Sequence, residues 1–466
     1  MAHHFANGIP TRLSMWQRVR EYAVPLSMIE TASARRAAGD WAGACAAARV
    51  DVDLDLRAVR NRHGTELVTR LRADLRRLAP DLLRWHMPRI APDGWLRPGL
   101  TVSLARYRES GAAPLHLVVR TPPAWADAGQ RMSLALWEES GSGAPGHHPH
   151  PHPDRRFRLD LHRHLWDSGR SGELARRCDA GGAPDSSWAT ATWAAEAERL
   201  LRAEGRARGA FTVRLGARSH AVLELVAPDD SHAPACRPLR EVLPPQEVAA
   251  LPVLPEVAAR VLPDLELLRA GLVGVDRLHP LVSAALAAYG SAASAGPAAE
   301  PEDPHRVECR GEVHRIAPRD GVLTAIDHDP AELRREELLV ALGGPALPCL
   351  RAIDTVHRSP QALPAVRERL GHGDVAGALA VVEGLLGPGA VLRDGPLREA
   401  LESAAARRVD HGLFRSGLVT VHPAAGGVAD PGRTAADHRP RLDRRTPPVL
   451  RHKRNSRSRP RTGLAS

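Results

Sequence analysis

The amino-acid sequence predicts an α+β protein, in which an antiparallel β-meander with helices precedes an all-α helical module and a disordered basic tail. Three observations support this prediction. Residues 329–408 carry the apolar spacing of several short helices, and residues 100–166 carry short β-type runs separated by turns. Residues 431–466 are rich in Arg, Pro and Ser and have almost no apolar content, so they cannot bury a core.

The helical module is expected to contain four or five short packed helices. Asp329 is placed to cap the first helix, Pro330 suits its first turn, and a Gly pair at 343–344 ends it. Asp374 is placed to cap a later helix, in which apolar residues recur at intervals of three and four. These residues are Val375, Ala378, Leu379, Val382 and Leu386. The spacing predicts one apolar stripe, which would pack against neighbouring helices.

One short motif occurs twice. Gly39–Ala46 and Gly373–Ala380 share Gly, Asp, Ala, Gly, Ala and Ala at matching positions. Both segments resemble the helix–turn–helix of a tetratricopeptide repeat, where G-D-x-x-x-A joins paired helices, and the resemblance implies two helical hairpins of a type that holds protein partners. The roughly 34-residue period of such arrays is missing, so the sequence does not predict an array.

Between these hairpins the pattern changes to β-structure. Four antiparallel strands are expected within residues 100–166, the last of them over 157–166. A helix over 192–205 and a hairpin over 210–228 follow, and a second hairpin is expected around the turn at 317–320. An earlier helix, which starts near Thr65, should break at Pro80 and resume beyond it.

These patterns divide the chain into five parts. Residues 1–27 form a poorly patterned extension, 28–230 an α+β domain, 231–305 a Pro-rich helical connector ending in a linker at 291–305, 306–425 a β-hairpin with the helical module, and 426–466 a disordered basic tail.

The charge is concentrated in the tail. The whole chain carries +10, and residues 431–466 hold eleven Arg or Lys against two Asp, which leaves 10 − 9 = +1 for residues 1–430. Such a tail is expected to attract nucleic acid, although a solubilising extension fits equally well. The residues that would carry the binding are Arg451, Lys453, Arg454, Arg457, Arg459 and Arg461.

Several function classes are excluded or disfavoured. Lys453 is the only lysine, so residues 1–452 lack the Lys that a P-loop, a protein kinase or a Schiff-base enzyme requires. Five scattered cysteines without a C-x-x-C pair indicate buried thiols in a reducing compartment rather than a zinc knuckle or a disulfide framework. No apolar run is long enough to span a bilayer, so we expect a cytoplasmic protein with no membrane association and no cofactor.

A histidine-rich stretch is the best metal candidate in the sequence. His147, His148, His150 and His152 lie in a Gly/Pro-rich loop that precedes Asp160, His162 and His164. On a strand, His162 and His164 would share a face with Asp160, and imidazoles bind zinc, copper or nickel. The competing interpretation is a low-complexity loop that binds metal adventitiously, because an exposed loop fixes no coordination geometry.

A second cluster lies around the hairpin that precedes the helical module. It comprises His314, Asp320, Asp327, His328 and Asp329. Histidine next to carboxylates could serve acid–base catalysis. Two of these carboxylates also suit structural positions, because Asp329 can cap a helix and Asp320 suits the turn. We therefore assign no catalytic residue from the sequence.

Three segments, 75–94, 334–360 and 367–387, resemble a family of uncharacterised proteins from high-GC bacteria over most of residues 28–420. The resemblance implies no activity, cofactor or site. The leading hypothesis is a non-enzymatic interaction or scaffold protein that offers a helical docking face to a protein partner. The alternatives are association with nucleic acid through residues 431–466 and a metal-dependent enzyme that uses the histidine-rich segment.

Overall fold

The computed structural model divides the chain into two compact units, Met1–Ala295 with Phe414–Ser466 and Gly296–Leu413. The structure describes residues 10–107, 114–139, 148, 150–178, 187–217, 219–226, 233–288, 306–309, 312–319, 322–345, 347–358, 362–387, 389 and 391–417. The predicted linker 291–305, the whole predicted tail 426–466 and His147 lie outside these residues, as do all six basic residues proposed to bind nucleic acid.

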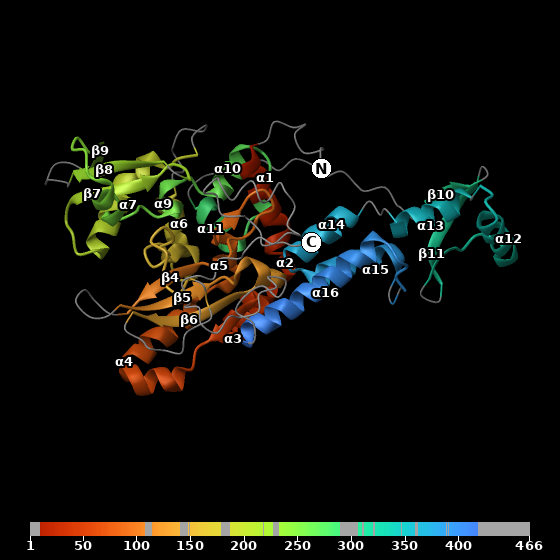
Figure 1. Cartoon of the computed structure of the whole chain (residues 1–466), viewed down its shortest axis with the longest axis horizontal. Coiled ribbons are helices and arrows are strands. Elements are labelled where there is room, and N and C mark those ends of the chain that lie inside the picture. Colours follow the sequence, from red (N-terminus) through yellow and green to blue (C-terminus); the bar gives the residue numbers. More distant parts are fainter. Residues whose placement is uncertain are drawn as a thin grey trace, which may run out of the picture. The chain divides into compact units, whose positions relative to one another are not determined.

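The α+β class is confirmed, because antiparallel strands and helices occur together (Figure 1). In the first unit, α1 (Thr11–Arg18) runs into a π-helical turn at Val19–Ala23, followed by α2 (Leu26–Ala37) and α3 (Trp41–Ala47). The long helix α4 (Leu56–Arg77) stops two residues before α5 (Pro80–His86) begins. The predicted break at Pro80 is therefore confirmed, since proline lacks the N–H that a helix interior needs.

The main sheet has the strand order β1-β6-β5-β4. Its strands are β1 (Val50–Asp53), β4 (Thr101–Arg106), β5 (Leu115–Arg120) and β6 (Met132–Glu138), while β2 (Arg89–Ile90) and β3 (Trp95–Leu96) form a small separate pair. Strands β4, β5 and β6 are antiparallel neighbours, as predicted (Figure 1). Strand β1 joins β6 in parallel, with Val50 opposite Met132, so the sheet is mixed rather than a pure meander.

The predicted fourth strand over 157–166 is wrong. This segment forms tight turns, followed by a short 3-10 helix at Arg163–Leu165. In the turns, backbone N–H groups donate to carbonyl oxygens three residues back; the N–H of Leu161, for example, donates to the carbonyl oxygen of Arg158 at 3.2 Å. It touches the edge of β4 through single bonds, including Asp160 N–H to Ser103 at 2.9 Å. The apolar residues Phe157, Leu159 and Leu161 imitate the two-residue period of a strand in the sequence. Burial does not follow that period, because Arg158 is buried and Leu161 is half-buried.

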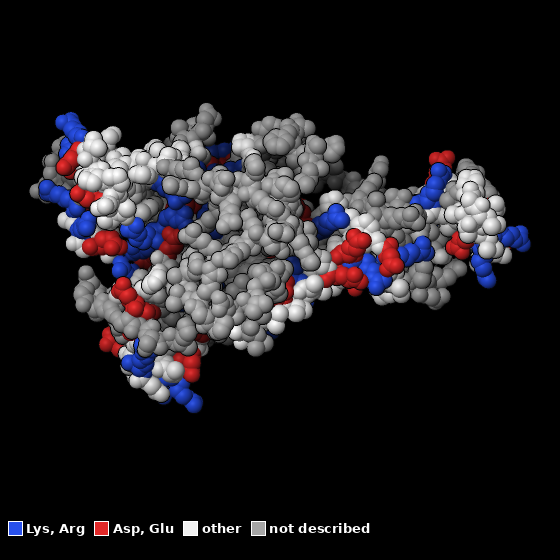
Figure 2. Space-filling view, in the orientation of Figure 1, with Lys and Arg blue, Asp and Glu red and all other residues white. Residues whose placement is uncertain are grey.

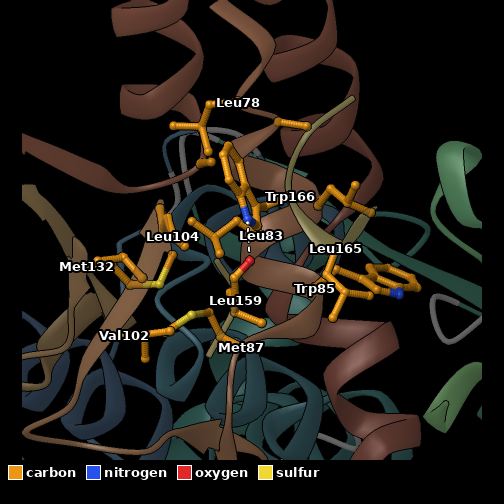
Figure 3. Packing of buried hydrophobic residues seen from close by; sticks show 14 of the residues in the cluster. Leu78, Leu83, Trp85, Met87, Val102, Leu104, Met132, Leu159, Leu165 and Trp166 are labelled. Atoms are coloured by element: carbon orange, nitrogen blue, oxygen red, sulfur yellow. Dashed lines mark hydrogen bonds between the residues drawn. The ribbon is translucent and has the colours of Figure 1, made fainter. Parts of the chain in front are cut away.

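The core of the first unit packs around Trp166 (Figure 3). The indole Nε1 of this fully buried residue donates to the carbonyl oxygen of Leu159 at 3.0 Å, which satisfies its one polar group. Helices, loops and strands contribute its neighbours in the cluster, among them Leu78, Leu83, Trp85, Met87, Val102, Leu104, Met132 and Leu165. Truncating a core tryptophan typically costs about 3–5 kcal/mol, so this cluster is a main source of stability.

A smaller sheet lies at one end of the first unit (Figure 1). Helix α7 (Trp193–Ala203) packs on the sheet β7-β8-β9 and confirms the predicted helix and hairpin. The strands are β7 (Gly209–Arg214), β8 (His220–Val226) and β9 (Ala235–Pro238), and α6 (Leu174–Arg177) precedes them in the chain. Phe211 and Leu201 are fully buried between helix and sheet.

The Pro-rich segment that follows forms broken helices, as its proline spacing predicts. These are α8 (Pro245–Ala250), α9 (Glu256–Ala259), α10 (Pro263–Arg269) and α11 (Pro280–Ala287). Leu265 of α10 and Val282 of α11 belong to the same core cluster as the main sheet. The segment is thus part of the packed first unit, and its residues help to build the site described below.

The second unit combines a three-stranded antiparallel sheet with five helices in its described part. The sheet consists of β10 (Arg306–Cys309), β11 (Glu312–Arg319) and β12 (Val322–Ala325), of which the last two form the predicted hairpin. The helices are α12 (Pro330–Ala341), α13 (Pro348–Arg358), α14 (Leu363–Gly371), α15 (Val375–Leu386) and α16 (Pro396–Arg415). Asp329 accepts from Ala331 N–H at 3.0 Å, which confirms the predicted cap.

The two G-D-x-x-x-A segments form the same local structure. Asp40 caps α3 by accepting from Gly43 N–H at 2.8 Å, and Asp374 caps α15 by accepting from Gly377 N–H at 3.2 Å. The preceding glycines also match, because Gly39 and Gly373 have φ angles of +79° and +80°. That left-handed conformation ends one helix and lets the chain turn into the next.

An arginine five residues before each aspartate completes the motif. Arg35 donates to the second carboxylate oxygen of Asp40 at 3.0 Å, and Arg369 does the same for Asp374 at 2.9 Å. The sequence identity therefore corresponds to one recurring helix–turn–helix structure, which occurs once in each unit.

None of the helices in the described part of the chain is both long and apolar enough to cross a membrane.

Candidate functional site

The structure brings His162 and His164 together, but around an arginine. Both imidazoles are buried beside the 3-10 helix Arg163–Leu165, with 3% and 5% of their surface exposed. Arg177 of α6 donates from Nη2 to Nδ1 of His162 at 3.0 Å and from Nη1 to Nδ1 of His164 at 3.2 Å. Because a guanidinium only donates, both Nδ1 atoms are acceptors, so the neutral rings carry their proton on Nε2.

Asp160 does not join these histidines. Its carboxylate accepts from Nε and Nη2 of Arg158, each at 2.8 Å, and Arg158 also donates to Glu204 at 2.7 Å. Within the part of the chain that the structure describes, the predicted triad is not among the groups whose donor atoms converge on one point. The two histidines share the Arg177 network, whereas Asp160 belongs to the Arg158 network.

The electrostatics of the histidine pair follow from burial. Burial lowers the pKa of His162 and of His164 well below the ordinary value, and the charge of Arg177 acts in the same direction. Both rings are therefore neutral near pH 7. The guanidinium itself is compensated by Glu196 of α7, to which Arg177 Nε donates at 2.9 Å.

A cavity of about 1100 Å³ opens next to this network in the first unit. Its wall is built by residues of α1, the segment from α5 to β4, the loop at 150–157, α6, and the segment from α9 to α10. The charged and imidazole side chains in the wall are predominantly basic. They comprise Arg12, Arg89, Arg97, Arg156, Arg177 and Arg260, the histidines His86, His150, His152 and His164, and the carboxylates Asp154 and Glu256.

Some of these cations already have carboxylate partners. Arg156 donates to Asp154 at 2.7 Å, and Arg12 pairs with Glu266. Arg89 differs, because it is only 7% exposed and its donors reach backbone carbonyl oxygens, including that of Gly94 at 3.4 Å. Its Nε has no hydrogen-bond partner among the residues that the structure places.

Two further cavity-lining nitrogens share this lack of a partner. They are Nε2 of His86, a residue only 6% exposed, and Nε of the half-buried Arg97. A buried polar nitrogen without a partner costs about 1–3 kcal/mol. Such nitrogens also occur away from the cavity, for example Nη2 of Arg84 and Nε of Arg120, so the cavity is distinguished by its excess of basic side chains over carboxylates.

The pKa shifts describe the same imbalance. Burial lowers the pKa of Arg89 to about 9, and the nearby charge of Arg20 contributes. Burial also lowers the pKa of Arg97, although Glu256 opposes this effect, and it lowers the pKa of His86 well below its usual range. A bound anion would favour the protonated form of all three groups, so the cavity electrostatically favours negative charge.

The second predicted cluster is also rearranged. Asp327 accepts from Arg315 N–H at 2.9 Å and from its Nη2 at 3.1 Å, and Asp329 caps α12. The ring of His314 stacks on that of His328 with 4.0 Å between centroids. Nε2 of His328 lies 3.4 Å from Sγ of Cys349 rather than beside a carboxylate. Asp320 is outside the described residues.

No protein family, curated protein or solved structure matches this chain, so its function has to be argued from geometry. Sequence reasoning missed the basic cavity, because His86, Arg89 and Arg97 carry no motif and lie far in sequence from the other wall residues. The high arginine content with almost no lysine was the sequence feature that could have indicated a basic cavity. In a chain that is also rich in Ala, Gly and Pro, this content does not show which arginines line a cavity.

Proposed function

We propose that the first unit binds a small organic anion, one that carries a phosphate or carboxylate group, in the cavity of about 1100 Å³. The observation that carries the proposal is the charge of the wall, which contains six arginines and four histidines but only two carboxylates, Asp154 and Glu256. Arg89 among them is more than nine-tenths buried and donates to the backbone carbonyl oxygens of Gly94 and Arg84.

Anion binding would offset the cost of this arrangement. A cation held away from water without a carboxylate partner destabilises a protein unless another anion compensates it. Guanidinium groups match the planar, paired oxygens of carboxylates and phosphates, and such charge-assisted bonds are roughly twice as strong as neutral ones. A ligand oxygen in the cavity would therefore gain strong hydrogen bonds from accessible guanidinium groups in the wall. The Nε atoms of Arg89 and Arg97 are themselves buried, so a ligand would compensate the charge of these two groups without bonding to those atoms.

The size and the apolar part of the wall limit the ligand. Pockets for organic ligands typically enclose about 300–1,000 Å³, so this cavity is larger than a lone inorganic anion requires. Trp16, Leu100 and Phe157 contribute apolar surface to the same wall. The arrangement supports a ligand with an anionic end near the arginines and an apolar or aromatic remainder.

Calorimetric titration of the full-length chain with citrate, pyrophosphate and adenosine triphosphate tests this proposal. We expect at least one probe to bind, and Arg97→Gln to weaken its affinity by about tenfold or more, the equivalent of one lost charge-assisted bond. Arg206→Gln is the matched control, because this exposed arginine does not line the cavity. Absence of binding by all three probes, or an equal effect of both variants, would contradict the proposal.

The hypothesis of a scaffold protein has separate support in the second unit. Large apolar side chains are exposed at the end of α12 and just after it, at Leu338, Leu339, Val340 and Leu342, with exposed fractions of 65%, 50%, 39% and 87%. Contiguous exposed apolar surface is typical of protein interaction sites. Co-purification with wild type and with a Leu338→Ser, Leu342→Ser variant tests it, and recovery of the wild-type chain alone would count against a stable partner.

A further inference from the structure

Three side chains from separate segments of the second unit meet at one point. Cys309 is the last residue of β10, His328 lies in the turn between β12 and α12, and Cys349 is the second residue of α13. Their donor atoms all lie within 4.8 Å of one another, and both cysteines are fully buried. The sequence gives little sign of this cluster, because the two cysteines are 40 residues apart and form no C-x-x-C pair.

The distances fit a tetrahedral metal centre. Around a zinc ion with bonds of about 2.3 Å to sulfur and about 2.05 Å to nitrogen, two sulfurs lie about 3.8 Å apart and a sulfur and a nitrogen about 3.6 Å apart. In the structure Sγ of Cys309 and Sγ of Cys349 are 3.9 Å apart, and Sγ of Cys349 and Nε2 of His328 are 3.4 Å apart. Two of the three donor pairs thus lie close to the spacing that coordination imposes, and the third pair, Cys309 with His328, lies within 4.8 Å.

We propose that Cys309, His328 and Cys349 bind a Zn²⁺ ion, with the fourth coordination position taken by water or an exogenous ligand. Two thiolates and one imidazole form a donor set that suits zinc, whereas oxygen ligands would be needed for Mg²⁺ or Ca²⁺. Three protein donors with one open position is the ligand count of catalytic rather than structural zinc sites. The half-buried position of His328 leaves that side of the cluster closer to solvent than the two sulfurs.

The surroundings support the ligands. The ring of His314 stacks on that of His328 at an angle of 22°, which restricts the orientation of the coordinating imidazole. Cys349 occupies the first turn of the eleven-residue helix α13 and is fully buried, which fixes the position of its sulfur. Both effects position a donor before the metal arrives.

A metal would also explain how this corner of the unit is held together. The buried cluster here consists of only four residues, Cys309, Ala325, Leu347 and Cys349, with Leu333 and Leu350 packed against it. Such a small apolar core contributes little stability, and a bound metal would add to it whatever the role of its open coordination position. Zinc would join β10, the turn after β12 and α13 through bonds whose free energy contributes directly to folding.

Metal analysis of the untagged full-length chain, purified after loading with Zn²⁺ and removal of excess metal, tests the proposal. We expect roughly one zinc per chain in the wild type and nearly none in Cys309→Ser, Cys349→Ser or His328→Gln. Cys236→Ser is the matched control, because this half-buried cysteine lies in β9 of the first unit. A triple Gln variant of His148, His150 and His152 should also keep its zinc, which separates this site from adventitious binding by the histidine-rich loop.

Cobalt provides a measurement that does not depend on the folding of variants. Titration of Co²⁺ into metal-free wild-type protein should produce a thiolate-to-cobalt charge-transfer band that saturates near one equivalent. Wild-type protein without that band, or with metal that survives loss of both Cys309 and Cys349, would overturn the proposal. Mass spectrometry of unreduced digests, made from protein that was purified under reducing conditions, tests for a disulfide between these two cysteines. Such a disulfide would overturn the proposal as well.

Discussion

Arg20 and Asp264 form a buried bidentate ion pair that joins the π-helical turn Val19–Ala23 to α10. Arg20 donates from Nε at 2.9 Å and from Nη2 at 2.8 Å, and both side chains are at most 2% exposed. The indole Nε1 of Trp85 donates to the same carboxylate at 3.0 Å, and the guanidinium lies 4.2 Å from the centroid of the Trp85 ring. Burial lowers the pKa of Arg20 although Asp264 raises it, so the cost of desolvation is large even with the partner present.

Asp264→Asn should therefore destabilise the first unit strongly. It leaves the buried guanidinium of Arg20 without a counter-charge, and loss of one partner of a buried pair typically costs about 3–5 kcal/mol. Urea unfolding followed by tryptophan fluorescence measures the effect, because all nine tryptophans lie between residues 16 and 193. An Arg20→Met, Asp264→Leu double variant should be less destabilised than Asp264→Asn. A double variant that is at least as unstable would show that the pair contributes more than charge compensation.

The local structure of this protein could be predicted further than its sites. Asp329, Asp40 and Pro80 act on their own neighbours in the chain, so capping and breaking rules place helix boundaries correctly. Segment 157–166 could not be predicted in this way, since its apolar residues alternate in the sequence while the backbone forms turns beside β4. A two-residue period of apolar residues does not establish that the backbone is extended, and here Arg158 between two apolar residues is buried as well.

The candidate sites depend on contacts between distant segments. Arg89 and Glu256 line one cavity, and Cys309 and Cys349 form one cluster, although no spacing in the sequence links either pair. The histidine-rich stretch had the stronger pattern, yet His162 and His164 are directed at Arg177. The residue type predicts that these imidazoles need polar partners if they are buried. It does not predict which residue is the partner, because that depends on the tertiary fold.

The two capping aspartates, Asp40 and Asp374, make the same hydrogen bonds but differ in how far their side chains are buried. The carboxylate of Asp374 is only 6% exposed, whereas that of Asp40 is 40% exposed. Asp374→Ala should destabilise α15 by about 1 kcal/mol or more, since loss of a cap leaves a buried N–H without its acceptor. Asp40→Ala should have a smaller effect on α3, because water can replace the carboxylate.

Hydrogen exchange of peptides over 375–386 and 41–47 measures the two effects separately. Exchange should accelerate more in the first peptide of the Asp374 variant than in the second peptide of the Asp40 variant. Asn variants are suitable controls, because the amide oxygen can still accept the capping bond, and they should exchange almost as slowly as the wild type. Equal acceleration by both Ala variants would contradict the role of burial.

Deletion of residues 431–466 tests the expected association with nucleic acid. The deletion removes a net charge of 11 − 2 = +9 and leaves 10 − 9 = +1 on residues 1–430. Figure 2 shows acidic and basic side chains interleaved over the described surface of the face in view, which fits a nearly neutral body. The full chain should be retained on immobilised DNA at low salt and released steeply as salt rises, because each released counterion contributes to the slope. Retention of the truncated chain would place the binding surface elsewhere.

The buried histidines predict that the first unit loses stability in mild acid. Burial lowers the pKa of His86, His162 and His164 well below the ordinary value, whereas in the unfolded chain each should titrate near the usual pKa of about 6.5. Below that pH the unfolded chain takes up protons that the folded unit does not, so the free energy of unfolding falls as pH falls.

Each such histidine contributes a slope of at most about 1.4 kcal/mol per pH unit. Urea unfolding followed by tryptophan fluorescence should therefore show a declining free energy of unfolding between about pH 7 and pH 5, and His164→Gln should reduce the slope. His220→Gln replaces an exposed histidine and should leave the slope unchanged. A glutamine at position 164 cannot take up the proton that the unfolded wild-type chain binds there. If the free energy of unfolding falls with pH equally steeply in all three proteins, groups other than His164 therefore determine the acid sensitivity.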